Sequence, residues 1–453
     1  MTDINVVETP HALPEAPADR TPWNVTTRVL FRFAFVYLTF YSLIPLAFVS
    51  PALLRDRSVF VNSQKVWTAV SVFATKNIFF NTTKFDPTFM GSDSVLGWSQ
   101  AGLIVLTAFI AAAVWSVLDR KHREYETLYA WLRVVVRIAL ALTLVFYGAQ
   151  KVWPDQMQLV RPHQLLSELG SFTPLQLLWV FVGASPGYER FSGLVEVAAG
   201  ALLFVPSLTT LGSLLAVVAL THVFALNVFY DVNVKLFSFH LLMMALFLLV
   251  ADVRRLTDVF LFNRSVAPAI EPPLFQSRTA ARAALIVQVL FGIVAISGML
   301  AFHHGLVPVL NVIEPSQVPY YGVWDVDDFS VDGTSHAALV TDEIRWHRIV
   351  FDDYNTASIQ RMNGAVIVAR LLKDVAHGTM TFNYAGDPRP ELREFGGPKW
   401  RAVLRVNPLS PDSLMMQGQY EGYSLTVRLE RSKVHTFLEP NEPHWILTER
   451  PRF

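Results

Sequence analysis

WLRVVVRIALALTLVFYGAQKV, residues 131–152, is the stretch that decides the fold expected for this chain. It is an apolar run of the length that an α-helix needs to cross the hydrocarbon core of a bilayer, about 20 residues. It nevertheless holds Arg133, Arg137 and Lys151. Charged side chains are costly inside a membrane, so ionisable residues within a span indicate a functional site or a paired charge.

Six further apolar runs of similar length flank this one, and we expect about seven transmembrane helices. The expected spans are 26–50, 97–118, 131–152, 187–206, 208–230, 235–251 and 281–302. The run 174–184 is too short to span, which favours a re-entrant or interfacial segment. Residues 65–80 form an amphipathic stretch, which predicts a helix lying on the membrane surface.

Charged residues are unevenly distributed along the sequence. They make up 16% of the chain, against roughly 25% in soluble domains. They are sparse up to Phe302 and frequent from Glu314 onward. This divides the chain into a disordered tail at 1–22, a transmembrane helical domain at 23–303 and a β-rich domain at 314–453. The formal net charge of zero gives no reason to expect nucleic acid as a partner.

The C-terminal domain carries the pattern of antiparallel strands. Runs such as 365–372, 400–406 and 423–429 alternate in polarity or are rich in β-forming residues, with Gly, Pro, Asn and Asp between them. This predicts a mainly antiparallel barrel or sandwich. The opening Gly322-Val323-Trp324 resembles the GxW start of lipocalin-like barrels, and the simpler alternative is a core tryptophan on a first strand.

The absence of cysteine limits the cofactors that the chain can hold. It excludes disulfides, iron–sulfur clusters and thiolate metal sites. We find no nucleotide-binding motif in the sequence. His222 and His240 lack the spacing that two ligands on one helix would show, so no metal site is expected.

Basic residues near the ends of the spans predict the orientation in the membrane. With the N-terminus in the cytoplasm, Arg28 and Arg32 lie inside, as does the arginine-rich segment 252–282. Seven spans then place the β-rich domain outside, which is the periplasm in a Gram-negative bacterium. We therefore expect a multi-pass protein of the bacterial inner membrane, with the lipid bilayer as its first partner.

Polar residues gather in the outer half of the expected bundle, and they predict a polar cavity open to the outside. Glu196 lies near mid-membrane, and with His222 and Lys151 it forms the predicted catalytic group. The predicted ligand-binding residues are Glu189, Arg190, Asn227, Asp231, Lys235 and His240. Arg137 lies deeper, on the inner side, apart from this cavity.

These residues also have structural explanations. Lysine side chains can reach the headgroups from a buried backbone, and histidines are often hydrogen-bonded parts of a core. For Glu196 the alternative is an ion pair between helices, with Lys151 as the nearest cation. Gly148 and Gly193 are small residues that would let the two helices approach closely.

The helical domain resembles the DoxX-like family of membrane proteins over roughly residues 25–265. Arg137 and the sequence YGAQK at 147–151 carry the resemblance on one helix. GLVE at 193–196 and DVNVKLFSFHLL at 231–242 carry it on the next ones. The segment GSDS before the second span is similar to a Gly-Ser-Gly-Asp pattern of that family but lacks its second glycine. The core is more distantly similar to the helical domain of vitamin-K-dependent carboxylases.

The DoxX-like family includes subunits of a thiosulfate–quinone oxidoreductase. The resemblance therefore implies a cavity that accepts a quinone or a similar lipid-soluble ligand. Glu196 or His222 would exchange protons with the headgroup, and Lys151 would stabilise the anion. Because the chain shows no redox cofactor motif, electrons would come from the substrate or from a redox partner subunit.

A non-enzymatic membrane module is the alternative hypothesis. In that case the bundle binds a lipid or a partner, and the outer β-rich domain captures a ligand or docks a protein. Co-purified lipids would separate the two hypotheses, because a bound quinone supports the first.

Overall fold

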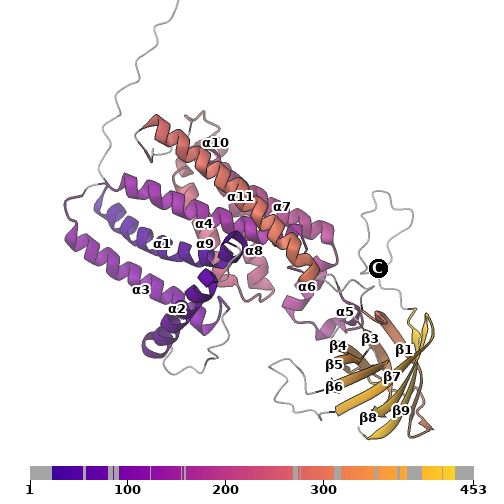
Figure 1. The fold of residues 1–453 in the computed structure, drawn as a ribbon. Coiled ribbons are helices and arrows are strands. Elements are labelled where there is room, and N and C mark those ends of the chain that lie inside the picture. Colours follow the sequence, from indigo (N-terminus) through magenta and orange to yellow (C-terminus); the bar gives the residue numbers. More distant parts are fainter. Residues whose placement is uncertain are drawn as a thin grey trace, which may run out of the picture. The chain divides into compact units, whose positions relative to one another are not determined.

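The computed structural model describes most of the chain, with helices up to residue 310 and strands from residue 322 onward (Figure 1). The described residues are 23–54, 58–79, 85, 91–122, 124–154, 156–157, 160–268, 274–275, 277–310, 318–351, 356–374, 378–384, 400–420 and 422–433. The tail predicted at 1–22 lies outside the described residues.

The chain divides into two compact units. The first unit comprises 1–144, 199–224 and 233–295. The second comprises 145–198, 225–232 and 296–453, so it holds helical segments as well as the strands.

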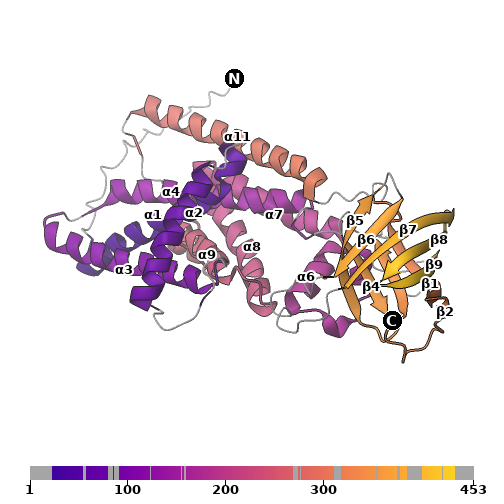
Figure 2. The same cartoon turned by 60° about the horizontal axis from the view of Figure 1, so that its bottom comes forward.

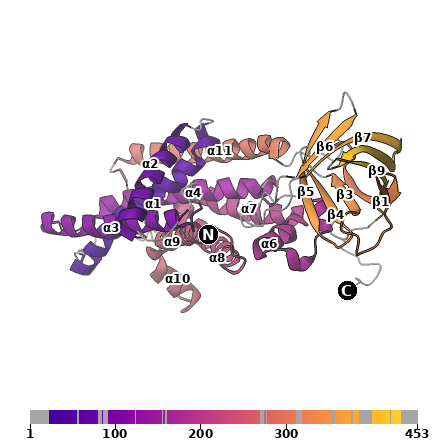
Figure 3. The same cartoon turned by 90° about the horizontal axis from the view of Figure 1, so that it is seen from below.

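The described residues form eleven α-helices, and seven of these overlap the seven expected spans (Figures 2 and 3). They are α1 (Val25–Leu54), α2 (Ser58–Ala74), α3 (Val95–Leu118), α4 (Glu126–Val152), α5 (Pro162–Leu165), α6 (Pro174–Gly183), α7 (Pro186–Leu203), α8 (Thr209–Phe229), α9 (Lys235–Val250), α10 (Val253–Phe260) and α11 (Arg278–Leu310). In the first unit α1 packs along α3, and α2 contacts both. Where α2 continues into a short π-helical turn, the Thr75 hydroxyl donates to Ser99 of α3 at 2.7 Å.

Five helical segments in the described part of the chain are long and apolar enough to cross a membrane. They are Val25–Ala47, Val95–Leu118, Glu126–Val152, Pro206–Phe229 and Arg278–Gly305. A sixth candidate arises if α9 and α10, which are bent by 78° relative to each other, count as one span. Several helices could therefore span a membrane, but the expected count of about seven is not confirmed.

The missing candidate is α7, which covers most of the run expected at 187–206. Its 18 residues include Glu189, Arg190 and Glu196, and three charged side chains are too many for an unassisted span of this length. The short apolar helix α6 has ten residues, in agreement with the expectation that 174–184 is too short to cross.

The C-terminal domain is a closed antiparallel β-barrel. Its strands are β1 (Gly322–Val331), β3 (Trp346–Phe351), β4 (Thr356–Arg361), β5 (Val366–Asp374), β6 (Thr379–Tyr384), β7 (Trp400–Ser410), β8 (Ser413–Tyr420) and β9 (Tyr423–Arg431). Each strand pairs with the next one in sequence, and β9 pairs back with β1 to close the barrel. The short β2 (Thr334–Ser335) pairs with the end of β1. Of the two predicted arrangements, the barrel is therefore correct.

Large apolar side chains fill the barrel interior, and Trp324 is among the fully buried ones. Its indole N–H donates to the carbonyl oxygen of Tyr320 at 2.7 Å. The guanidinium of Arg431, from β9, lies 4.6 Å from the centroid of the Trp324 ring, within the range of a cation–π contact. The simpler explanation of the GVW opening, a core tryptophan on the first strand, is confirmed. The sequential strand order is that of up-and-down barrels, which include lipocalins.

Candidate functional site

Lys151 and Glu196 meet in the second unit, on α4 and α7. The Lys151 ammonium donates to both carboxylate oxygens of Glu196, at 2.9 Å to Oε1 and 2.8 Å to Oε2. The two residues are only 7% and 3% exposed. A buried charge is tolerated when it is both paired and hydrogen-bonded, as here. The contact is the helix–helix ion pair that the sequence offered as the structural explanation of Glu196.

Two glycines bring α4 and α7 to the separation that this ion pair needs. A Cβ atom added at Gly193 would lie 2.5 Å from the carbonyl oxygen of Gly148 and 2.7 Å from the Cβ of Lys151. A Cβ atom added at Gly148 would lie 2.7 Å from the carbonyl oxygen of Gly193. The two backbones are therefore in direct contact, which is the role of small residues between membrane helices.

Glu189 is the second carboxylate of α7 and is fully buried. It lies seven positions before Glu196, which places both on the same face of the helix. Its Oε1 accepts a hydrogen bond from the backbone N–H of Met157 at 3.0 Å. This carboxylate therefore holds the segment that follows α4.

Several of the predicted site residues are exposed. His222, predicted as part of the catalytic group, is exposed on α8. Arg190 and Asp231 are also exposed, whereas Asn227 is buried. Of the nine predicted residues, the structure brings Lys151 and Glu196 into direct contact. Catalytic or ligand-binding roles for the others stay predictions.

His240 is buried in the first unit, between α1 and α9. Its Nδ1 lies 2.6 Å from the carbonyl oxygen of Leu236, one turn earlier on α9. Its Nε2 is hydrogen-bonded to the hydroxyl of Tyr37, and its ring stacks on Tyr41 with the centroids 3.9 Å apart. These contacts are those of a hydrogen-bonded core histidine.

Lys235 begins α9 and is tied to the segment before α3. The Asp93 carboxylate accepts hydrogen bonds from the backbone N–H groups of Lys235 and Leu236, at 2.9 and 2.8 Å. The Lys235 ammonium lies 3.4 Å from the same carboxylate. The first N–H groups of a helix lack acceptors within it, and an acidic side chain there is stabilising. The aspartate of the GSDS segment therefore fixes the start of α9, a role that its sequence did not reveal.

A polar cluster ties Arg32, within the first candidate span, to residues between the second and third candidate spans. Arg32 donates to the hydroxyl of Tyr125 at 2.6 Å and to the carbonyl oxygen of Asp119 at 2.7 Å. The side-chain hydrogen bond with His122, helped by those from Tyr125 and Trp115, lowers the pKa of Asp119 to about 2. Asp119 is therefore an anion at physiological pH.

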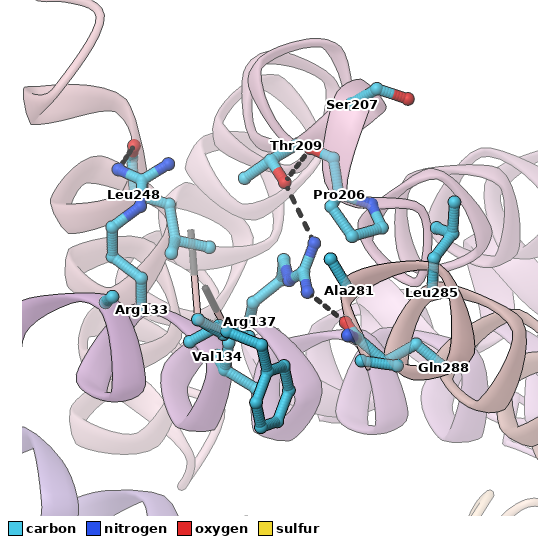
Figure 4. A pocket seen from close by; sticks show the side chains of 14 residues that line it. Arg133, Val134, Arg137, Pro206, Ser207, Thr209, Leu248, Ala281, Leu285 and Gln288 are labelled. Atoms are coloured by element: carbon cyan, nitrogen blue, oxygen red, sulfur yellow. Dashed lines mark hydrogen bonds between the residues drawn. The ribbon is translucent and has the colours of Figure 1, made fainter. Parts of the chain in front are cut away.

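Arg133 and Arg137 line a cavity of about 270 Å³ in the first unit (Figure 4). Arg137 donates to the hydroxyl of Thr209 on α8 at 3.2 Å and to the side-chain oxygen of Gln288 on α11. Arg133 donates to the carbonyl oxygen of Leu248 on α9 at 3.1 Å. Four helices thus contribute to one buried polar site.

The rest of this cavity is mostly apolar. The side chains that line it, besides the two arginines, are Ala130, Val134, Pro206, Ser207, Thr209, Leu248, Leu274, Phe275, Ala281, Ala284, Leu285 and Gln288. Among these described residues there is no aspartate or glutamate. The sequence showed that Arg133 and Arg137 are one helical turn apart, but it carried no signal for Thr209 or Gln288.

Comparison with known proteins identifies one relative of this chain. It is 32% identical over 124 residues to the uncharacterized protein YwoB of Bacillus subtilis (strain 168). The match covers 27% of this chain and 79% of YwoB. The chain belongs to the YwoB family.

No family model matches the chain, and no solved structure matches it. Because YwoB is described as uncharacterized, membership of the YwoB family brings no activity with it. The function has to be argued from the contacts of the described residues.

The first prediction concerns the ion pair between α4 and α7. Replacing Lys151 by Met, or Glu196 by Gln, should each lower the stability by about 3–5 kcal/mol, because each leaves a buried partner without its counter-group. The double variant should lose less than the sum of the two. A double-mutant cycle on thermal unfolding in detergent measures this coupling. Strictly additive losses would show that the two side chains do not depend on each other.

Proposed function

We propose that this chain is a multi-pass protein of the bacterial inner membrane that acts as a non-enzymatic binding and assembly module. Its N-terminus lies in the cytoplasm and its β-barrel on the extracytoplasmic side. The helices hold lipid-soluble ligands or partner helices, and the barrel docks a partner protein.

The observation that carries this proposal is the closed contact of Lys151 with Glu196. A general base must come within hydrogen-bond distance of the proton that it removes. Both oxygens of Glu196 are instead engaged by the Lys151 ammonium, at 2.8 and 2.9 Å, beside the contact of Gly148 with Gly193. The arrangement joins two helices, which is what an assembly module needs.

The same ion pair supports seven membrane crossings. Three charged residues within only 18 positions distinguish α7 from the five candidate spans. Pairing neutralises Glu196, and the buried Glu189 accepts a hydrogen bond from the backbone N–H of Met157. Both contacts reduce the cost of placing this helix in hydrocarbon. With α7 and the bent pair α9–α10 added to the five, an odd number of spans separates the N-terminus from the barrel.

Because side chains fill its interior, the barrel is better suited to docking a partner protein on its surface than to enclosing a ligand. Trp324, Trp346 and Phe382 are fully buried inside it. The outer surface carries charged pairs such as Arg348 with Asp325, at 2.6 Å. A barrel with these features offers its outer surface to a partner.

A second candidate is a quinone-binding component of an oxidoreductase, as the DoxX-like resemblance implies. The observation in its favour is that the YGAQK and GLVE segments do contact each other, through Lys151 and Glu196. For this function the ion pair would have to open, so that Glu196 exchanges a proton with the headgroup and Lys151 stabilises the anion. A redox partner subunit would supply the electrons.

Identifying the lipids that co-purify with the protein distinguishes the proposed binding module from the quinone-binding component. The full chain and its Glu196→Gln variant are purified in mild detergent, and the extracted lipids are identified and quantified. We expect no quinone at a one-to-one ratio in either protein. An equimolar quinone that is lost in Glu196→Gln but kept in Glu168→Gln, an exposed carboxylate, would establish the second candidate instead.

The orientation can be tested cleanly because the chain has no cysteine. Single cysteines are placed at Ser335 in the barrel and at Lys121 between α3 and α4, both exposed positions. In intact cells of a Gram-negative host with a permeabilised outer membrane, a maleimide that cannot cross the inner membrane should label Ser335→Cys. Lys121→Cys should react only after lysis. The reverse pattern would refute the orientation, and labelling of both in intact cells would refute the inner-membrane topology.

A further inference from the structure

Helix α10 turns sharply away from α9 at the end of the sixth expected span. The two helices are bent by 78° relative to each other, at Ala251 and Asp252. When α9 crosses a bilayer, a helix at this angle runs nearly parallel to the membrane surface. The 16 residues of α9 reach about 24 Å at 1.5 Å per residue, less than the roughly 30 Å of a hydrocarbon core. Helix α10 therefore lies at the boundary of the hydrocarbon.

Contacts of Asp252 and Arg255 hold the bend in place. The Asp252 carboxylate accepts hydrogen bonds from the hydroxyl of Thr210 on α8 at 2.6 Å and from Arg255 at 2.5 Å. Arg255 also donates to the carbonyl oxygen of Ala267, beyond the end of α10, at 3.1 Å. The start of α10 is thereby tied to α8, and the segment that follows is tied back to α10. The direction of α10 is set by these contacts.

Apolar and charged residues lie on opposite faces of α10. Val253, Leu256 and Phe260 are spaced three and four positions apart, which places them on one face of the helix. Arg254 and Asp258 lie on the other face. The apolar face is not covered, because Val253 is exposed and Phe260 is 72% exposed. A helix with two such faces is typical of segments that lie in the plane of the membrane interface.

The exposed apolar surface continues past the end of α10. Leu261 and Phe262 directly follow Phe260, and Leu261 is 76% exposed. Phe260 also lines a cavity of about 630 Å³, together with Leu211 and Leu214 of α8. Lipid tails are as apolar as leucine side chains, so acyl chains suit the space between α8 and the apolar face of α10.

Arginines flank this apolar surface. Arg254 is exposed on the charged face of α10, and Arg264 is exposed shortly after the helix ends. Arg278 and Arg282 are exposed on the first two turns of α11. Residues 252–282 hold five arginines against three acidic residues. In the proposed orientation this side of the bundle is cytoplasmic, where anionic lipids give the membrane surface its negative potential.

We propose that residues 253–264, the α10 anchor, bind the anionic headgroup layer of the cytoplasmic leaflet. The apolar face of α10, with Leu261 and Phe262, enters the boundary of the acyl chains. Arg254 and Arg264 bind headgroup phosphates through charge-assisted hydrogen bonds. This inference rests on the proposed membrane location and orientation. A protein that covers the same apolar surface is the alternative outcome of the test.

Spin labels in lipid nanodiscs test this proposal, since the chain has no cysteine of its own. Single cysteines are placed in the full chain at Leu261 in the α10 anchor and at Lys121, an exposed position between α3 and α4. The labelled proteins are reconstituted in phosphatidylcholine, with or without phosphatidylglycerol. Collisions with oxygen, which enters hydrocarbon, and with a water-soluble nickel chelate report the depth of each label. With phosphatidylglycerol, the nickel chelate should collide several-fold less often with the label at position 261 than with that at 121.

A change of charge tests the role of the headgroups. Arg254→Gln combined with Arg264→Gln should return the label at Leu261 to the depth that it has in pure phosphatidylcholine. Arg120→Gln removes an exposed arginine after α3 and should leave the depth unchanged. Frequent nickel collisions at Leu261, or equal depth in the two membranes, would overturn the proposal. Protection of this label from both reagents would also overturn it, in favour of a protein contact.

A label at Val294, exposed on α11, separates failure of this inference from failure of the proposed membrane location. It should collide mainly with oxygen in both kinds of nanodisc. Frequent nickel collisions at Val294 would refute the membrane location itself. If Val294 behaves as expected and Leu261 does not, the α10 anchor alone is wrong. Phe262→Cys gives a second exposed position in the anchor if Leu261→Cys fails to fold.

Discussion

The buried ion pair of Lys151 with Glu196 is the interaction on which the rest of the structure depends. A carboxylate in the middle of an apolar helix is tolerated only when a partner removes the cost of its charge. Here the partner comes from α4, and the contact of Gly148 with Gly193 lets the two helices approach closely enough. Without Lys151, α7 would hold a buried carboxylate with no counter-charge from α4.

Three buried cations lie on α4, and they contact different partners. Lys151 is paired with an acid and its contact is closed, so it serves the assembly of the helices. Arg133 and Arg137 are oriented by a hydroxyl, an amide and a backbone carbonyl, and they line a cavity.

Sequence reasoning succeeded where the physical signal is local. Apolar runs located most of the helices, alternation located the β domain, and the need of a mid-span carboxylate for a cation pointed from Glu196 to Lys151. Sequence reasoning failed where a site is formed by segments that are far apart in the sequence. Gln288 lies 151 positions after Arg137 and accepts a hydrogen bond from it. No sequence pattern near Arg137 predicts this contact. Likewise the exposure of His222 follows from how α8 packs, which its own sequence does not encode.

Exchange of the two charges tests the central claim most directly. Lys151→Glu and Glu196→Lys are made singly and together, and thermal unfolding of each protein is followed in the same detergent. If the pair is the closed structural contact described above, each single reversal places two like charges together and destabilises strongly. The double reversal should then recover most of the loss. A double variant as unstable as the two single losses combined would contradict the account.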